Sequence, residues 1–389
     1  MKLVTASANR ELDELLDLIG LSVQLTPPQF DRAETSYHAV ADWLKAPDSP
    51  VRRYGPDIFA QGSLRLDTTV RPLSYTEFDL DLVCLLQISD QVNPAAVYDL
   101  LLRRMRDHGT YDKIIVELPR CIRLDYSGDF HLDIVPAIPD PACPPGDTCL
   151  KIPDRLLKKW RASNPKGYST WFETQAAKRR LVEKYARFSA NANVEPLRDP
   201  APAYLKPPLK LAVQLFKRWR DVAFQGREDV APSSIILTTL SGRLYQGEHH
   251  PTDALATILD GVCLWSQQAG QIELMNPSNP KECITDRWKE KPDSYDAFVE
   301  AIYDFRTAMR KLIDEGRYPD CIDDLKEMFG DWPVARAITK FAKRRKEASD
   351  SGRLLIEKSS GVLAVTSAPV LPGAAPGFVK GKAHTFHGE

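Results

Sequence analysis

Two aspartates inside an apolar segment constrain the fold of this chain more than any other feature. The segment Phe78-Asp79-Leu80-Asp81-Leu82-Val83-Cys84-Leu85-Leu86 has the composition of a buried strand, and only Asp79 and Asp81 carry charge in it. Residues two apart on a strand point to the same face, so the two carboxylates project together. Because charged side chains are rarely buried without a partner, we expect the fold to supply one.

A third aspartate follows in a second apolar segment, His131-Leu132-Asp133-Ile134-Val135. If the two segments pair as strands, Asp79, Asp81 and Asp133 converge. Like charges this close are unfavourable unless a cation compensates them. Oxygen ligands select Mg²⁺ or Mn²⁺ over zinc. We therefore predict that these three aspartates are catalytic and bind metal, with two Mg²⁺ ions, or Mn²⁺ in their place, as the cofactor.

A small polar motif lies upstream of the aspartates. Gly62-Ser63 follows the apolar run Asp57-Ile58-Phe59-Ala60-Gln61. A glycine lets the backbone approach a ligand closely, and a helix start with a serine hydroxyl can hold phosphate oxygens. A Gly-Ser pair alone is only a turn, and Asp-X-Asp alone is common. Their combination predicts phosphoryl or nucleotidyl transfer, which needs a phosphate cradle beside a two-metal carboxylate site.

The remaining pattern predicts an α+β chain with two lobes. Residues 1–50 are expected to be N-terminal helices, with a long helix starting at the capping box Thr26-Pro27-Pro28-Gln29. Residues 51–150 contain short apolar segments that predict a small mixed sheet with one or two covering helices. From 151 to 348 helical spacing dominates, beginning with Pro153–Arg161. Residues 349–389 lack a core pattern and are expected to form a flexible tail.

Composition limits the other classes of function. The net charge of −1 excludes a bulk polycation, so we expect no obligatory nucleic-acid partner. The chain has no apolar run long enough to span a membrane and begins without a signal-peptide pattern, which predicts a cytoplasmic protein with no membrane partner. Its seven cysteines are expected to be reduced thiols. Zinc at Cys143 and Cys149, or near His249-His250 and Cys263, is the less favoured alternative, because the spacing is not that of a structural zinc site.

These motifs together resemble the polymerase β superfamily. The run Gln61-Gly62-Ser63-Leu64-Arg65-Leu66-Asp67-Thr68-Thr69-Val70-Arg71-Pro72, followed by Glu77-Phe78-Asp79-Leu80-Asp81, resembles the bacterial cGAS/DncV-like nucleotidyltransferases (CD-NTases) of CBASS anti-phage systems. The 15 residues between Ser63 and Asp79 exceed the gap of minimal nucleotidyltransferases but suit this branch. Further segments look like the family: Ile152-Pro153-Asp154-Arg155, Ser163-Asn164-Pro165-Lys166-Gly167-Tyr168, Lys206-Pro207-Pro208-Leu209, Pro232-Ser233-Ser234-Ile235-Ile236, and Asn276-Pro277 with Trp288 after it.

The resemblance covers about residues 25 to 345 and implies a polymerase β-like palm with a C-terminal helical lobe. It implies that Asp79 and Asp81 bind both metals, and that Asp133 binds the catalytic metal and helps deprotonate the acceptor hydroxyl. It also implies triphosphate contacts; the candidates are Gln61, Gly62, Ser63, Lys217, Lys210 as second choice, Ser233 and Ser234. The alternative for the two lysines is a solvated helix face. Tyr75, Tyr168 and Tyr245 are all open as base-stacking residues.

The implied activity is condensation of ribonucleoside triphosphates, ATP among them, into a cyclic di- or trinucleotide second messenger for anti-phage defence. A linear oligonucleotide synthase or a transferase with a small-molecule acceptor shares the same carboxylates and stays open. A non-catalytic nucleotide-binding scaffold is disfavoured, because it needs no metal-binding aspartates. The basic run from Lys340 to Lys346 is interpreted as the solvated end of a helix. A ubiquitin-transfer-like or peptide-binding regulator acting on the tail is a weaker expectation, since the terminal Glu389 departs from the small final residue expected.

Overall fold

The computed structural model describes most of the chain. The described residues are 2–73, 78–126, 128, 130–144, 146–178, 206–315 and 320–351, with three later strands at 354–357, 363–365 and 378–380. For residues 2–10, residue 315 and these three strands only the backbone is described. Among these residues, no helix has both the length and the apolar character needed to cross a bilayer.

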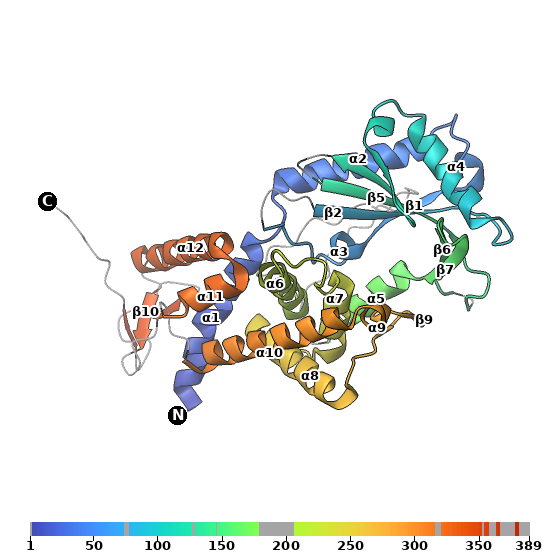
Figure 1. The fold of residues 1–389 in the computed structure, drawn as a ribbon. Helices are drawn as coiled ribbons and strands as arrows, with labels where there is room; N and C mark the ends of the chain where they lie inside the picture. The colour runs from blue at the N-terminus through green and yellow to red at the C-terminus, as the bar shows by residue number, and fades with distance from the viewer. Residues whose placement is uncertain are drawn as a thin grey trace.

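A seven-stranded mixed sheet forms one lobe (Figure 1). Its main path runs β1-β2-β5-β4-β3, and β6 pairs with the end of β5 and with β7. Only β2 and β5 are parallel; the other pairs are antiparallel. The strands are β1 (Asp57–Gln61), β2 (Phe78–Leu85), β3 (Ile115–Glu117), β4 (Ile122–Tyr126), β5 (Phe130–Pro139), β6 (Leu150–Asp154) and β7 (Lys159–Ser163).

Two helices cover one face of this sheet, and their sequences explain why. Helix α2 (Pro27–Lys45) begins where Gln29 Oε1 accepts a hydrogen bond from the Thr26 amide at 3.0 Å, as its capping-box sequence predicts. Its apolar stripe, spaced by three and four residues, is fully buried, as is that of α4 (Pro94–Arg106). Both helices pack on the inward-facing residues of the strands, such as Leu80 and Leu132. The other face of the sheet carries a small apolar cluster of Phe59, Val83, Ala137 and Leu150, and the polar side chains of β2 and β5 lie on that same face.

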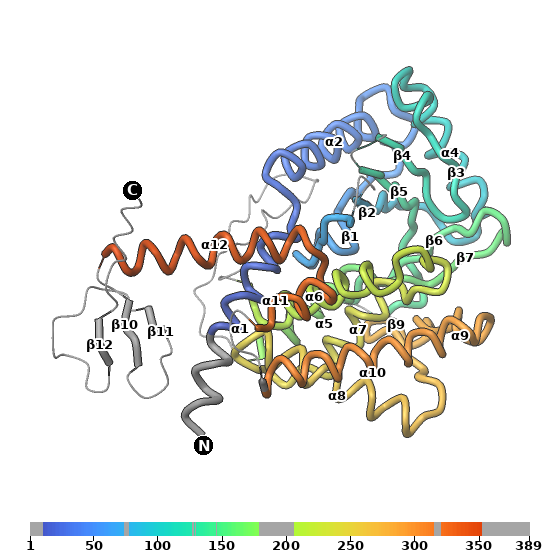
Figure 2. Tube along the Cα trace, turned by 60° about the vertical axis from the view of Figure 1, so that its left-hand side comes forward, coloured from blue at the N-terminus to red at the C-terminus, as the bar shows by residue number. Residues whose placement is uncertain are grey.

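The second lobe is helical, as expected. A single core joins α6, α8, α10 and α11 to the first helix of the chain, α1, which also packs along α12 (Figure 2). The predicted unit 1–50 is thus divided, because α1 belongs to the helical core and α2 to the sheet. The helices are α1 (Lys2–Ser22), α5 (Pro165–Ala176), α6 (Pro208–Ala223), α7 (Ser234–Leu244), α8 (Pro251–Ala269), α9 (Asp286–Glu290), α10 (Pro292–Glu315), α11 (Ile322–Phe329) and α12 (Asp331–Asp350).

Short elements complete the described fold. They are η1 (Arg52–Tyr54), α3 (Gly62–Arg65), η2 (Tyr111–Lys113) and the hairpin β8 (Met275–Asn276) with β9 (Asn279–Cys283). The basic end of α12 is held by ion pairs to α1: Arg345 lies 3.2 Å from Glu11, and Arg344 lies 3.6 Å from Glu14. This part of the basic run therefore stabilises the contact between two helices.

The helix predicted at Pro153–Arg161 is wrong, because this segment is the hairpin β6–β7. Its turn holds Lys158 in the left-handed region at φ 51°. Leu156 and Leu157 supplied much of the helical spacing, but they lie in the turn and are 73% and 52% exposed. Apolar residues at the tip of a hairpin can have the spacing of a helical stripe although they do not pack against a core.

Two further expectations are corrected. Within the tail, β10 (Leu354–Glu357), β11 (Leu363–Val365) and β12 (Phe378–Lys380) form a three-stranded sheet in the order β11-β10-β12. Cys143 and Cys149 form a disulfide with a Cα–Cα distance of 5.7 Å, so not all cysteines are free thiols. The Pro- and Gly-containing loop between them turns sharply enough to bring them together, and pairing removes the thiolates that zinc would need. The chain end, including Glu389, lies outside the described residues.

Candidate active site

The parallel pairing of β2 with β5 brings the three aspartates together. In its register Asp81 lies beside Asp133, and Asp79 lies beside His131. On the other side of β2, Gln61 of β1 lies opposite Asp81. Because side chains alternate along a strand, all of these residues face away from the covering helices α2 and α4. The convergence predicted for Asp79, Asp81 and Asp133 is confirmed by this register.

The carboxylates perturb one another strongly. Burial raises the pKa of Asp81 to about 7, and the charges of Asp133 and Asp79 add to the effect. The pKa of Asp79 is raised as well, by partial burial of its carboxyl and by the charge of Asp133, against the opposing influence of Arg123. The three carboxylates carry up to three negative charges, and the guanidinium of Arg123 pairs with two of them. An all-oxygen donor set with excess negative charge fits a hard divalent cation.

Arg123 of β4 is the residue at this site that the sequence did not reveal. It pairs in register with Asp133, and its Nε and Nη2 donate to the two Asp133 oxygens at 2.7 and 2.8 Å. Its Nη2 also donates to Asp79 Oδ1 at 3.2 Å. The only signal in the sequence is the alternation Ile122-Arg123-Leu124, which puts Arg123 on the polar face of its strand but does not identify its partner.

The predicted phosphate cradle is built by the turn from β1 into α3. Gly62 opens α3 with φ 66°, a left-handed conformation that favours glycine. A Cβ at this position would overlap Asp81 Oδ2 and lie 3.3 Å from Asp81 Cγ. The glycine is thus needed because the backbone passes directly against the carboxylate of Asp81. Ser63, the next residue, accepts a hydrogen bond from the Thr69 hydroxyl at 3.4 Å.

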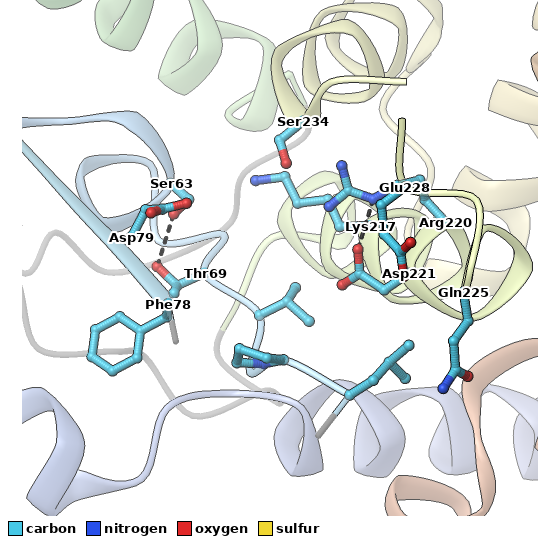
Figure 3. A pocket seen from close by; sticks show the side chains of 13 residues that line it. Ser63, Thr69, Phe78, Asp79, Lys217, Arg220, Asp221, Gln225, Glu228 and Ser234 are labelled. Carbon is cyan, nitrogen blue, oxygen red and sulfur yellow. Dashed lines mark hydrogen bonds and ion pairs between the residues drawn. The ribbon is translucent and has the colours of Figure 1, made fainter. Parts of the chain in front are cut away.

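Two adjoining pockets open onto this cradle. The first, of about 350 Å³, lies between the sheet and α6. Figure 3 shows Ser63, Thr69 and Asp79 on one side of it, across from Lys217, Arg220 and Asp221. The second, of about 340 Å³, has Asp81, Gly62 and Gln61 at one end. The two pockets share four lining residues: Ser63, Asp79, Lys217 and Ser234.

Comparison with known proteins matches this chain to one family. Residues 9–176 match the family described as the Second Messenger Oligonucleotide or Dinucleotide Synthetase domain. A c-di-GMP synthase of Roseivirga ehrenbergii is 31% identical over 383 residues, which cover 95% of this chain and 98% of the relative. The chain belongs to the cGAS/DncV-like nucleotidyltransferases, the CD-NTases. It is therefore a nucleotidyltransferase, as predicted.

Two further CD-NTase comparisons extend over both lobes. The cyclic dinucleotide synthase CdnG of Bradyrhizobium diazoefficiens is 28% identical over 407 residues, covering 97% of this chain and 95% of the relative. The structure of the Bradyrhizobium diazoefficiens CD-NTase CdnG in complex with GTP superimposes with a TM-score of 0.67 and 25% identity, covering 84% of this chain and 97% of that one. CD-NTases are in general metal-dependent, in agreement with the donor set formed here.

The two candidate lysines of α6 differ in their surroundings. Lys217 lines both pockets, and its Nζ donates to the Thr68 carbonyl and hydroxyl at 3.3 and 3.1 Å. Burial lowers its pKa to about 7. Lys210 lines neither pocket and forms an ion pair with Glu173 at 2.7 Å. Lys217 therefore lies at the pockets, whereas Lys210 connects α6 to α5.

The loop between the cradle and the aspartates is held by side chains that donate to its backbone. Lys206 Nζ bonds the Asp67 carbonyl at 3.1 Å, and Gln214 bonds the Thr69 carbonyl at 2.8 Å. Arg218 bonds the carbonyl of Arg71 at 3.2 Å. Together with Lys217, these residues fix residues 67–71 against α6. The long gap between Ser63 and Asp79 noted in the sequence is therefore an ordered wall of the first pocket as far as Leu73.

Replacing Lys217 with methionine is expected to weaken triphosphate binding. A charge-assisted hydrogen bond contributes about 1.5–3 kcal/mol, so KM for the nucleotide should rise roughly 10- to 100-fold. Lys210→Met is the matched control on the same helix face. It should lower the melting temperature by breaking its pair with Glu173 but leave KM within about twofold. Equal KM changes in the two variants, measured by steady-state kinetics, would contradict this assignment.

Some of the remaining predicted residues line the pockets and others do not. Ser234, the first residue of α7, lines both pockets, whereas Ser233 precedes it and lines neither. Tyr168 lines the second pocket, with its hydroxyl 2.8 Å from that of Thr239. Tyr245 is buried in the helical core. Tyr75 lies outside the described residues. Of the aromatic candidates that the structure describes, Tyr168 alone borders the site.

Proposed function

We propose that this CD-NTase joins two GTP molecules into the cyclic dinucleotide c-di-GMP and releases two molecules of pyrophosphate. The observation that carries the proposal is the pair of adjoining pockets that share Ser63, Asp79, Lys217 and Ser234. A cyclic dinucleotide needs two nucleotides bound at once beside one set of catalytic groups. Pockets of about 350 and 340 Å³ meeting at an aspartate meet that requirement.

The choice of guanine rests on two kinds of support. The Roseivirga relative is a c-di-GMP synthase, and the Bradyrhizobium CdnG structure is a complex with GTP. In this chain carboxylates line both pockets: Asp221 and Glu228 the first, and Glu282 the second. Carboxylates only accept hydrogen bonds, and guanine offers N1–H and N2–H₂ donors side by side. Adenine offers a donor beside an acceptor on that edge and fits a carboxylate less well.

Each condensation step forms one bond and breaks another. The ribose hydroxyl of one nucleotide attacks the α-phosphorus of the other, and a new P–O bond forms. The bond from the α-phosphorus to the oxygen bridging the α- and β-phosphates breaks, and pyrophosphate leaves with that electron pair. Asp133 is the proposed acceptor of the hydroxyl proton, a role that the family resemblance implies and that its position beside Asp81 in the strand register supports. A second step of the same kind, with the roles of the nucleotides exchanged, closes the ring.

The other residues bind and orient the nucleotides. Gln61, Gly62 and Ser63 present the turn into α3 to the donor triphosphate, and Lys217 faces it from α6. Asp79, Asp81 and Asp133 would hold the divalent cations, for which we propose two Mg²⁺ ions. Bound metal would supply charge neutralisation of the triphosphate and a lower pKa of the attacking hydroxyl. The product is proposed to act as a second messenger in anti-phage defence, the role that the family resemblance implies.

Mass spectrometry of the products from single and mixed ribonucleotides tests the proposal. With GTP and Mg²⁺ alone, the expected product has the mass of c-di-GMP and resists phosphatase, because a ring has no terminal phosphate. A linear phosphatase-sensitive product would indicate the open alternative of an oligonucleotide synthase. A cyclic product that forms only when ATP is added would refute the choice of guanine for one pocket. No product from any ribonucleotide would refute the function as a whole.

A further inference from the structure

Arg123 occupies a position for which the condensation mechanism gives no role. Its guanidinium engages Asp133 in a bidentate pair through Nε and Nη2, at 2.7 and 2.8 Å. The same Nη2 reaches Asp79 Oδ1 at 3.2 Å. Its Nη1 lies 3.5 Å from His131 Nδ1. One side chain therefore contacts two of the three carboxylates, Asp133 and Asp79, and also His131, which lies beside Asp79 in the strand register.

The two carboxylate contacts are unequal. Asp133 is only 11% exposed and uses both oxygens in a bidentate pair, the strongest geometry available to arginine. Asp79 is 59% exposed and accepts through a single longer contact. A competing cation would therefore displace Arg123 from Asp79 much more readily than from Asp133. A carboxylate oxygen can accept more than one hydrogen bond, so pairing with Arg123 does not by itself exclude a further partner at Asp133.

The carboxylate oxygens are too far apart to hold one metal ion together, and the guanidinium of Arg123 lies between two of them. Asp79, Asp81 and Asp133 are all among the described residues, yet their oxygens do not gather within 4.8 Å of one another as the ligands of a single ion would. The guanidinium lies between Asp79 and Asp133, where it supplies the positive charge that keeps them in place. A divalent cation held by all three carboxylates requires their oxygens to approach one another.

We propose that Arg123 is an internal counterion of the metal site. In the metal-free enzyme it stabilises the carboxylates by pairing with Asp133 and Asp79. When a divalent cation binds, Asp79 transfers from Arg123 to the cation, while Arg123 continues to position Asp133. Arg123 thus competes with the metal and sets its affinity. This inference rests on the proposed binding of metal by the three aspartates, but not on the identity of the bases or of the product.

The test is Mn²⁺ binding to the full-length protein without nucleotide, measured by calorimetry and by electron paramagnetic resonance. Arg123→Met keeps much of the side-chain volume and removes the charge, so the unrelieved repulsion among the carboxylates should tighten Mn²⁺ binding about fivefold or more. Arg123→Lys keeps the charge and should remain near wild type. Arg103→Met, an exposed arginine of α4, is the matched control and should leave Mn²⁺ affinity unchanged.

Thermal melting provides the second measurement. In chelator, Arg123→Met should lower the melting temperature by about 1–2 °C, the size of shift expected for the loss of one such pair in a chain of this length. Saturating Mn²⁺ should restore most of that loss, because the ion replaces the missing charge. A residue with only a structural role would lower the melting temperature equally with and without Mn²⁺. That result, or unchanged or weaker Mn²⁺ binding in Arg123→Met, would overturn the inference.

The double variant Asp79→Asn, Asp81→Asn separates this inference from the proposed function. If it loses Mn²⁺ binding while Arg123→Met binds like wild type, the metal site is correct and the role of Arg123 is refuted. If the double variant binds Mn²⁺ as well as wild type does, the three aspartates are not the metal site. Both the metal part of the proposed function and this inference then fail.

Discussion

Replacement of Asp81 by asparagine is expected to reduce nucleotide condensation by about three orders of magnitude or more, because metal-assisted charge stabilisation contributes several kcal/mol to such reactions. Asp81 lies between Gln61 and Asp133 in the sheet. Burial, together with the neighbouring carboxylates, raises its pKa to about 7. Asparagine keeps the shape of the side chain but carries no charge for a cation. The rate of pyrophosphate release from GTP and Mg²⁺ measures the effect.

The Asp81→Asn variant should lose activity because the reaction is impaired, and not because the protein unfolds. Removing a charge whose burial is unfavourable should leave the metal-free melting temperature unchanged or raise it. Asp112→Asn, at an exposed position in η2, is the control and should be as active as wild type. An Asp81→Asn enzyme with more than about a tenth of wild-type activity would show that Asp81 is not a metal ligand, since that corresponds to less than about 1.4 kcal/mol.

Gly62→Ala is expected to lower activity about 100-fold or more while the protein stays folded. The added Cβ would overlap Asp81 Oδ2, so either Asp81 or the turn that carries Ser63 must move. Misplacing groups at the reacting centre by about 1 Å can reduce a rate about 100-fold. Steady-state kinetics with GTP, together with a melting curve, measures both consequences.

Gly55→Ala separates this effect from backbone strain. Gly55 has a left-handed φ of 55°, close to the 66° of Gly62, but its Cβ would meet nothing nearer than Gln87 Cγ at 3.8 Å. Both alanines carry a similar conformational cost, of about 1–2 kcal/mol. Gly55→Ala should therefore lower the melting temperature and preserve the rate. If the two variants lose activity equally, strain and not the contact with Asp81 explains the need for glycine at position 62.

Local patterns in the sequence were sufficient to predict the sheet and its acidic residues. The alternation through Phe78–Leu85 puts Asp79 and Asp81 on one face in any sheet, because the period of a strand is a property of the backbone. The capping box at Thr26, which starts α2, likewise depends only on neighbours in the chain. These predictions are confirmed because each is decided within a few residues.

Where a residue's role depends on a distant partner, the sequence left it open. Lys210 and Lys217 share a helix face by their spacing, yet only the placement of Glu173 on α5 and Thr68 on the loop separates their roles. The hairpin β6–β7 was predicted as a helix because the spacing of Leu156 and Leu157 does not reveal that they are exposed. Cys143 and Cys149 pair because a loop folds back, which their spacing did not require.

The sequence by itself determined that this chain carries three strand aspartates behind a Gly-Ser turn, and therefore its chemistry. Only the tertiary structure decided that β5 lies parallel to β2 with Asp133 beside Asp81, and that β4 then places Arg123 against both Asp133 and Asp79. The physical reason is that side-chain direction follows from local backbone geometry, whereas strand order and register depend on the packing of the whole sheet under α2 and α4.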